Sequence, residues 1–594
     1  MTMLIFNHMK KYIYIILLGG LALGSASCKK DFIDLKPQDQ LTDAAYFKQP
    51  SDFRAYATGF YGQLMGWASP YGGNDVFNHM DVSSDLSTYY AFSSDVGRGT
   101  IVVPATDPAY SNAYSWIRSQ NILLKQAAVY SGNAADIKQY VGEAYFFRAN
   151  AHYSLLKRFG GVPIVTTVLD VNDLTPARNS RYEVVTQILS DLDNAIADLP
   201  IEQAISSADK GRISKWAAES LKAEVELYEA TWRKYNGAVT DFAGSGKPSS
   251  DQTAQFFSEA ASLAKDVMDN GGYTLWNYNT SLSNQSSFYL FNLEDAGSNP
   301  AGLTKASNNE FILYSVYDYV LKQGGVNLSF TSYMMTPSRK MMDMYLCTDG
   351  LPASKSPLFQ GYHNPGDEYK NRDFRMTSYA GGIPTTVDLT KGGPGYANVK
   401  FASYNYGSYR NANQESPNFP IIRLAEVYLI YAEALYEKNG SITDAQLDES
   451  INKIRDRAGV AHLTNGLVST NGLNMLDEIR RERTVELFHE GFRYDDLKRW
   501  GIAETALNGS TCGEVVGDAS YTTAFRNSAG ANTSFYAPSS YVWGEEAVST
   551  AAGTLKCVVI DSKSNHNFSK KNYLWPIPQV EINLNSKLRQ NPGY

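Results

Sequence analysis

The chain has 594 residues, of which 43% are hydrophobic and 19% are charged, so it encodes a folded protein of one to three domains and not a disordered one. Its formal net charge is −8 without a long basic run, which argues against a nucleic-acid partner. Its 4 cysteines are too few for a disulfide framework. Tyrosine is abundant, with 41 residues against 26 Phe, which suits surfaces on which rings stack but is also tolerated in loop-rich secreted chains.

The N-terminus has the order of a secretory signal. Two lysines precede an apolar segment, Tyr12–Leu23, which is followed by small residues and then Cys28. This segment has about 12 residues, whereas a membrane-spanning helix needs roughly 20. A small-residue run that ends in cysteine resembles the lipobox of bacterial lipoproteins, although Ser25 stands where Leu is usual. We therefore expect 1–27 to be a lipoprotein signal peptide and Cys28 to be acylated; an ordinary signal peptide is the alternative.

Helical periodicity predicts a scaffold of paired helices further along the chain. In 181–199 the apolar residues fall on one helical stripe that Pro200 closes, and a second stripe ends at Gly440. Alanine-rich faces allow close approach and resemble tetratricopeptide-type helix hairpins, but no fixed period of about 34 residues indicates a regular solenoid. The predicted scaffold covers mainly 40–65, 110–235, 255–270 and 423–500. Within these ranges, similar helical runs lie at 142–158, 214–233, 255–269, 447–458 and 475–500.

Three long inserts interrupt this scaffold, at 66–109, 273–422 and 502–572. They are rich in Gly, Ser, Asn, Thr, Pro and Tyr, and inserts of this length are usually functional or poorly ordered. Cys512 and Cys557 lie in the third insert and form either one bridge or two free thiols. The predicted fold class is mainly α: a tetratricopeptide-like helix-pair scaffold with large irregular, loop-rich inserts and no sharp domain boundary.

Catalytic and metal-binding motifs are missing from the sequence. It has no His-Glu-x-x-His, no Gly-x-Ser-x-Gly, no phosphate loop and no dinucleotide fingerprint, and its 7 histidines are scattered. A secreted carbohydrate-cleaving enzyme would need two carboxylates that face a cleft. Of the two obvious pairs, Asp495 and Asp496 lie on a predicted helix among basic residues, and Asp31 and Asp34 lie next to the predicted anchor. We predict no catalytic residue, no cofactor and no metal, and keep such an enzyme as the alternative function.

The densest pattern of charges lies at 475–501. Arg483 falls on an otherwise apolar helix face, and a buried arginine needs a carboxylate such as Glu486 or Glu433. The pattern fits an anion site or a buried ion network that holds helices together. The second interpretation is favoured, which makes Arg483 a scaffold residue.

This segment closely resembles the signature of the SusD/RagB family. From Glu482 to Trp500 it matches E-R-x-x-E-L-x-x-E-G-x-R-x-x-D-L-x-R-W. The segment Asn371–Arg375 departs from the family's usual Asn-Arg-Asp-Pro-Arg at Phe374, in a predicted turn. The resemblance spans nearly the whole chain, because other family-like motifs occur in the family's order. They are GEAYFFRANAHYSLLKRFGGVPIV from Gly142, RLAEVYLIYAEAL from Arg423, INKIRDRAG from Ile451 and YLWPIPQVEINLNSKLRQNPGY from Tyr573.

The resemblance implies a surface lipoprotein of a Bacteroidetes-type bacterium. Residues 28–594 would form one SusD-like domain that Cys28 anchors to the outer membrane. Family members bind oligo- or polysaccharides, or sometimes other nutrients, and hand them without chemistry to a partner TonB-dependent transporter of the SusC type. A non-glycan nutrient- or protein-binding adaptor on the same fold is a further alternative.

Candidate ligand-binding residues lie in the inserts. Sugars present flat C–H faces and hydroxyls, so a site for them needs exposed rings together with amide, acid or guanidinium groups. We predict Trp67, Tyr89, Trp276 and Tyr396 as stacking platforms and Asp81 and Arg372 as hydroxyl partners. For each ring, a contact within a small satellite core is the alternative.

Overall fold

The computed structural model leaves out the signal region and parts of the inserts. The predicted signal peptide and Cys28 lie outside the residues it describes. No helix in the described part of the chain is both long and apolar enough to cross a bilayer. The described residues are 46–67, 81–89, 94–170, 172–238, 241–329, 335–362, 366–381, 396–403, 409–516, 542–551 and 553–594.

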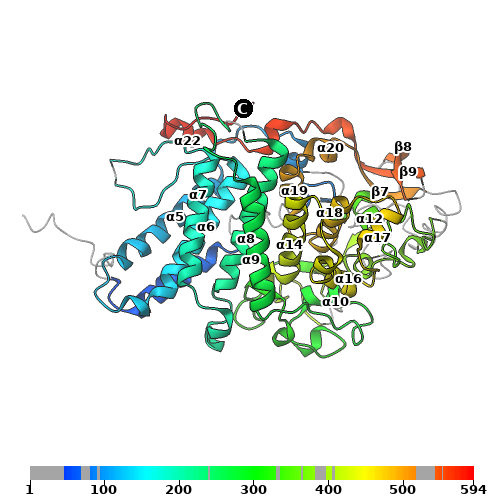
Figure 1. Ribbon diagram of the computed structural model, residues 1–594, viewed down its shortest axis with the longest axis horizontal. Coiled ribbons are helices and arrows are strands. Elements are labelled where there is room, and N and C mark those ends of the chain that lie inside the picture. Colours follow the sequence, from blue (N-terminus) through cyan, green and yellow to red (C-terminus); the bar gives the residue numbers. More distant parts are fainter. Residues whose placement is uncertain are drawn as a thin grey trace, which may run out of the picture.

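Long helices form a regular half of the molecule (Figure 1). Each packs against the next, from α5 to α9, and α9 then packs against α14, which contacts α18. The fold is thus mainly α, with tetratricopeptide-like helix pairs, although the long insert at 273–422 separates α9 from α14 in the sequence. These helices are α5 (Pro108–Ala127), α6 (Lys138–Phe159), α7 (Arg181–Asp198), α8 (Lys215–Asn236), α9 (Thr253–Asn270), α14 (Leu424–Asn439) and α18 (Met475–Glu486).

Local sequence explains where these helices begin and end. Ser180 and Glu183 form a capping box at the start of α7, in which each side chain bonds the other residue's main chain. Gly440 ends α14 with a φ of 69°, a left-handed conformation that glycine adopts without strain. Ala217 and Ala218 are fully buried, and their small side chains let the helices approach closely. The periodicity of the sequence therefore identified this half correctly.

Two predicted helices are broken in the structure. Residues 475–500 form α18 and a separate α19 (Arg493–Arg499), because His489 and Gly491 between them have φ values of 60° and 85°. The Asp81 carboxylate accepts hydrogen bonds from the main-chain N–H groups of His489 and Arg493, at 2.7 and 3.2 Å, and so caps α19. The partner lies 408 residues away in sequence, so helical periodicity could not reveal the break. The segment predicted at 447–458 likewise consists of α15 (Asp444–Asp448) and α16 (Ile451–Ala458).

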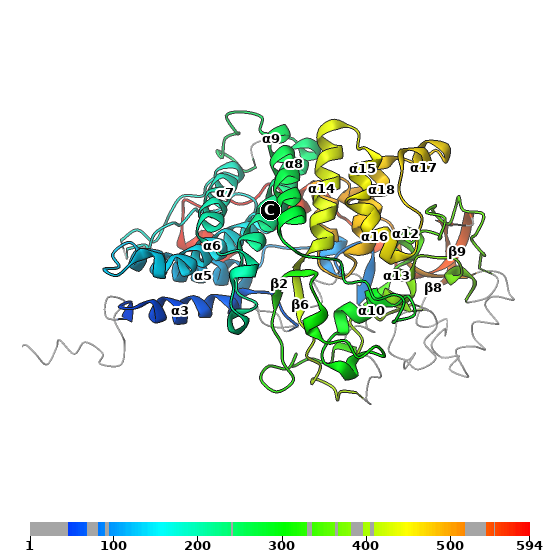
Figure 2. The same cartoon turned by 60° about the horizontal axis from the view of Figure 1, so that its bottom comes forward.

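Short helices and strands make up the irregular half. β2 and β6 pair beneath α8 and α14, and α3 lies beside α5 (Figure 2). The other short helices are α3 (Pro50–Thr58), α4 (Asp95–Arg98), α10 (Ser286–Tyr289), α12 (Arg339–Met344), α13 (Phe374–Tyr379), α17 (Asn465–Thr470), α20 (Ala503–Leu507) and α22 (Gln579–Leu584). The antiparallel strand pairs are β1 (Ser87–Tyr89) with β3 (Met335–Pro337), β2 (Phe311–Ser315) with β6 (Phe419–Arg423), and β4 (Ala380–Gly381) with β5 (Ala397–Asn398).

A three-stranded sheet lies within the insert that was predicted to be irregular at 502–572. β9 (Gly553–Asp561) pairs antiparallel with both β7 (Thr511–Val516) and β8 (Val542–Thr550), at the edge of the molecule (Figure 1). Cys512 pairs with Val559 and Cys557 with Val515, so the two cysteines are not directly opposite. Both are buried free thiols, which decides between the two predicted alternatives.

The irregular half has an apolar core of its own. Trp67, Trp276, Tyr379 and Phe488 belong to one buried cluster, separate from the core between the long helices. Within the residues described, the insert at 273–422 therefore contributes to a packed core, and rings such as Trp276 and Tyr379 point into it.

Candidate functional site

The charge-rich segment of the family-like signature lies in the interior, where the two halves meet. The buried Glu486 carboxylate accepts hydrogen bonds from Arg375 of α13, Arg423 at the end of β6 and Arg457 of α16, at 2.8, 2.6 and 2.6 Å. Burial alone would raise the pKa of Glu486, but these three guanidinium groups hold it well below its ordinary value. An ionised carboxylate thus ties three separate segments to α18.

The network continues through more buried charges. Arg423 also bonds Glu310 and Glu490, at 3.0 and 2.7 Å, and Lys400 bonds Glu490 at 2.7 Å. Burial lowers the pKa of Lys400 to about 8. Because these charges satisfy one another, the segment acts as a scaffold and not as an anion site.

Arg483 is buried and paired, as a scaffold residue should be, but its predicted partners were wrong. Its Nε lies 2.9 Å from Asp496, and Glu433 instead accepts from Arg499 and from the Trp500 indole, at 2.6 and 2.7 Å. The break between α18 and α19 brings Asp496 back toward Arg483, which a continuous helical wheel does not show.

Five of the six predicted ligand residues have buried side chains. The backbone of Tyr89 lies in β1, and its side chain lies outside the described part of the structure. A buried ring cannot stack on a sugar, and a buried acid or guanidinium cannot bond its hydroxyls, so the structure does not support the prediction for the remaining five. Their exposed fractions are 0% for Trp67, 2% for Asp81, Trp276 and Tyr396, and 4% for Arg372.

These five side chains support the irregular half from inside. The Trp67 indole donates to the Pro417 carbonyl at 2.7 Å, and the Trp276 indole donates to the Ser307 hydroxyl at 3.1 Å. The Tyr396 hydroxyl donates to a buried glutamate, Glu368, and Asp81 caps α19. The Arg372 guanidinium donates to four main-chain carbonyls, those of Leu346, Glu368, Met342 and Tyr345.

An exposed ring site that the sequence analysis missed lies on a tight hairpin after β2. Asp318 and Lys322 exchange main-chain hydrogen bonds of 2.8 and 2.9 Å, and the Asp318 carboxylate accepts from the N–H groups of Val320 and Leu321. The hairpin is thereby fixed, yet its tip is apolar and exposed, by 85% at Val320 and 87% at Leu321. Tyr319 beside them is 41% exposed.

Tyr319 stacks on an arginine that comes from a distant segment. The Arg410 guanidinium carbon lies 4.1 Å from the ring centre of Tyr319 and 4.0 Å from that of Tyr409. Asp295 accepts from the Arg410 guanidinium and from the Tyr409 hydroxyl, both at 2.7 Å. We call Tyr319, Tyr409, Arg410 and Asp295 the tyrosine–arginine stack.

The electrostatics of the tyrosine–arginine stack keep its groups in fixed roles. Partial burial would raise the pKa of Asp295, but Tyr409, the Gly297 amide and Arg410 together hold it below its ordinary value, so the carboxylate is ionised. Burial and the neighbouring Asp295 raise the pKa of Tyr409, so its phenol stays protonated. The exposed Tyr319 ring and the ionised Asp295 carboxylate thus lie beside an apolar tip, with the Arg410 guanidinium holding them in place. Such a ring can cover a sugar's C–H face, and the carboxylate can bond its hydroxyls.

The tyrosine–arginine stack joins three segments, around 295, 319 and 409. No sequence pattern brings these segments together, although the run VYDYVLKQGG contains an Asp before three exposed ring and aliphatic residues and a Gly pair after them. The absence of a side chain at Gly297 makes room for the Tyr409 ring, because a Cβ there would lie 3.0 Å from that ring. In the described part of the chain, no three His, Cys, Asp or Glu side chains are grouped so that they could hold a metal ion.

Comparison with known proteins gives the same family from both halves of the chain. The SusD family model matches residues 329–594, and a model described as "Starch-binding associating with outer membrane" matches residues 31–227. A SusD-like protein of Bacteroides ovatus is 26% identical over 491 residues, which cover 81% of each chain. A SusD-like protein of Formosa agariphila is 24% identical over 496 residues, covering 80% of this chain and 87% of the relative.

Solved structures share the fold. The crystal structure of a SusD-like carbohydrate-binding protein from Bacteroides fragilis NCTC 9343 has a TM-score of 0.68 and 22% identity, and covers 92% of this chain and 100% of that one. A laminarin-binding SusD-like protein has a TM-score of 0.54 and 19% identity, with coverage of 92% and 100%. These relatives are described as carbohydrate-binding proteins and not as enzymes. The chain belongs to the SusD/RagB family.

Proposed function

We propose that the protein is a cell-surface glycan-binding lipoprotein that captures an oligo- or polysaccharide and passes it, chemically unchanged, to a partner SusC-like TonB-dependent outer-membrane transporter. In this proposal residues 1–27 are removed, and acylated Cys28 anchors one domain, residues 28–594, to the outside of the outer membrane. The family supports glycan binding at the outer membrane, since one matching model is described as "Starch-binding associating with outer membrane".

The observation that carries the binding role is the tyrosine–arginine stack. Its Tyr319 ring is 41% exposed and its ionised Asp295 side chain is 59% exposed, while the Arg410 side chain is 11% exposed. Asp295 and the Asp318 hairpin fix its geometry. Burying one ring face on a sugar contributes about 1–2 kcal/mol, at roughly 25 cal/mol per Å². A few such contacts give modest affinity, which suits a protein that must release its cargo to a pore.

Affinity electrophoresis in gels that contain soluble starch, laminarin or other soluble polysaccharides tests this role. Tyr319→Ala and Tyr409→Ala should each weaken retention about five- to thirtyfold on the polysaccharide that retards the wild type, because each removes one ring. Tyr278→Ala is the matched control, since Tyr278 is an exposed tyrosine outside the tyrosine–arginine stack. Retention of both stack variants at the wild-type level would place the site elsewhere, and release of reducing ends by the wild type would favour the enzyme alternative.

Fractionation of the producing cells tests the anchor. Cys28→Ala should move the protein out of the membrane fraction, because acyl chains on that cysteine are the proposed attachment. The same variant should bind polysaccharide in solution like the wild type, since Cys28 lies far from the tyrosine–arginine stack in sequence. Unchanged membrane fractionation of Cys28→Ala would contradict the lipid anchor.

A further inference from the structure

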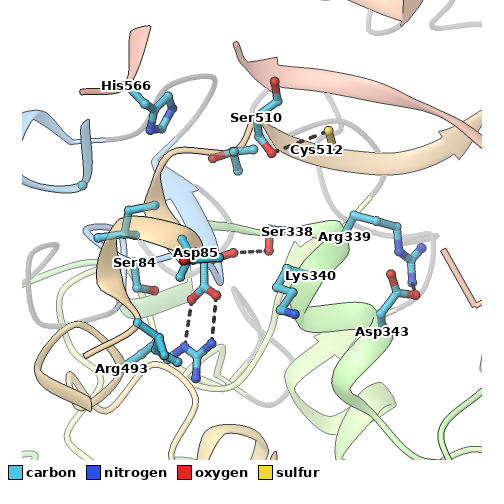
Figure 3. Close-up of a pocket in the computed structure, with 17 residues that line it drawn as sticks. Ser84, Asp85, Ser338, Arg339, Lys340, Asp343, Arg493, Ser510, Cys512 and His566 are labelled. Carbon is cyan, nitrogen blue, oxygen red and sulfur yellow. Dashed lines mark hydrogen bonds and ion pairs between the residues drawn. The ribbon is translucent and has the colours of Figure 1, made fainter. Parts of the chain in front are cut away.

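A pocket lies between α12, α20 and the start of β7 (Figure 3). Its volume is about 490 Å³, within the range of roughly 300–1,000 Å³ that is typical of small-molecule sites. It shares no residue with the tyrosine–arginine stack, so the two are separate features of the molecule.

Most charges in the wall of this pocket are already paired. Arg493 donates two hydrogen bonds of 2.8 Å to the two carboxylate oxygens of Asp85. Arg339 pairs with Asp343 at 3.0 Å and also with the buried Glu368 at 2.9 Å. These groups hold one another and leave no carboxylate oxygen of Asp85 for a ligand cation.

Lys340 is the remaining cation of the wall. It is exposed, and within the described residues it makes no hydrogen bond or ion pair. Figure 3 shows its side chain extending from α12 toward the side of the pocket that holds Asp85 and Arg493, while Arg339 on the same helix turns to the other side. A lysine that has no carboxylate partner among the described residues can pair with an anionic group of a ligand.

The pocket also has apolar lining residues. Ile502, Ala506 and Leu507 of the α20 region line it, with Ile502 37% exposed, and so do the hydroxyl-bearing Thr505 and Ser510. An inorganic anion would leave most of this volume empty and gain nothing from the apolar lining residues. A saccharide unit would fill the volume and contact both kinds of lining residue. Its C–H face can cover the apolar residues while a substituent reaches Lys340.

We propose that this pocket binds a saccharide unit that carries a carboxylate or a sulfate group, with Lys340 as the residue that pairs with that group. The inference rests on the proposed function for the class of ligand. It adds a second site, selective for acidic sugars, to the ring site of the tyrosine–arginine stack.

Calorimetric titration of the full chain with small glycosides tests the pocket directly. The probes are methyl glucuronoside, a methyl glucoside 6-sulfate, methyl glucoside and inorganic sulfate. The wild type should bind the two charged glycosides at least about tenfold more tightly than methyl glucoside or inorganic sulfate. Lys340→Gln should remove this preference and Lys340→Arg should keep it, whereas Lys453→Gln, at an exposed lysine of α16, should behave like the wild type.

The outcomes separate this inference from the proposed function. Binding of the charged glycosides that Lys340→Gln leaves unchanged would overturn the inference, and so would equal affinity for methyl glucoside or for inorganic sulfate, or no binding by the wild type. Tyr319→Ala should leave these titrations unchanged. The pocket inference can therefore be wrong while the proposed function holds. In that case Lys340→Gln still binds polysaccharide in the gel, and Tyr319→Ala does not.

Discussion

The helix-pair half and the irregular half of this protein satisfy the same physical demands by different means. In the first, the main-chain groups pair with one another in helices, and small buried residues such as Ala217 let neighbouring helices pack closely. In the second, side chains provide hydrogen-bond partners for main-chain groups, as where Arg372 donates to four carbonyls. Buried ion pairs around Glu486 hold the segments together. Buried main-chain groups need partners in either case, so loss of regular structure is offset by long-range polar contacts.

The difference has a consequence for binding. Helix pairs place residues at fixed short spacings, whereas the irregular half brings together residues from segments about a hundred positions apart, such as Asp295 and Arg410. Rigid sites can therefore form there without regular secondary structure, provided that the internal network holds.

Removing the centre of that network should give the largest effect. Glu486→Ala leaves three guanidinium groups without their shared carboxylate, and breaking buried pairs in this way costs about 3–5 kcal/mol, so we expect a loss near 5 kcal/mol in the free energy of unfolding. Urea unfolding measures it, with the exposed Glu504→Ala as control. A loss below about 1 kcal/mol would mean that the irregular half does not depend on the network.

A pH series should sharpen the comparison at the boundary between the halves. Burial raises the pKa of Asp81 to about 7, although the amides of His489 and Arg493 and the charges of Lys400 and Arg493 oppose the rise. An unfolded Asp titrates near pH 4, so between about pH 4 and 7 the folded protein keeps a proton that the unfolded chain has lost, and stability falls as pH rises.

Asp81→Asn removes this titration and keeps an oxygen that can accept a main-chain N–H. Relative to the wild type, its free energy of unfolding should therefore rise by about 4 kcal/mol between pH 4 and 7, from the roughly three-unit pKa difference. Denaturant unfolding at several pH values measures this, with the exposed Asp136→Asn as control. A difference that stays constant with pH would show that Asp81 titrates normally.

The smallest effect is expected at the edge sheet. Cys512 and Cys557 are free buried thiols, so a thiol reductant should leave the midpoint of thermal unfolding unchanged. A midpoint that falls on reduction would reveal a bridge between β7 and β9.

The sequence predicted the helix-pair half well because its signals are local. The Ser180 capping box and Gly440 stand at the helix ends that they determine. The α18–α19 break was missed, because the Asp81 carboxylate that caps α19 lies 408 residues from His489 in the sequence. Composition located the rings of the irregular half but could not separate buried Trp67 from exposed Tyr319, because that depends on which segments pack over them.

Hydrogen–deuterium exchange with and without a bound polysaccharide tests the central claim most directly, namely that the irregular half binds the glycan and the helix pairs do not. The account predicts slower exchange on ligand addition in the hairpin at 316–323 and at 409–411, with no change in α6, α7 or α8. Slower exchange in those helices, with the hairpin unchanged, would contradict it.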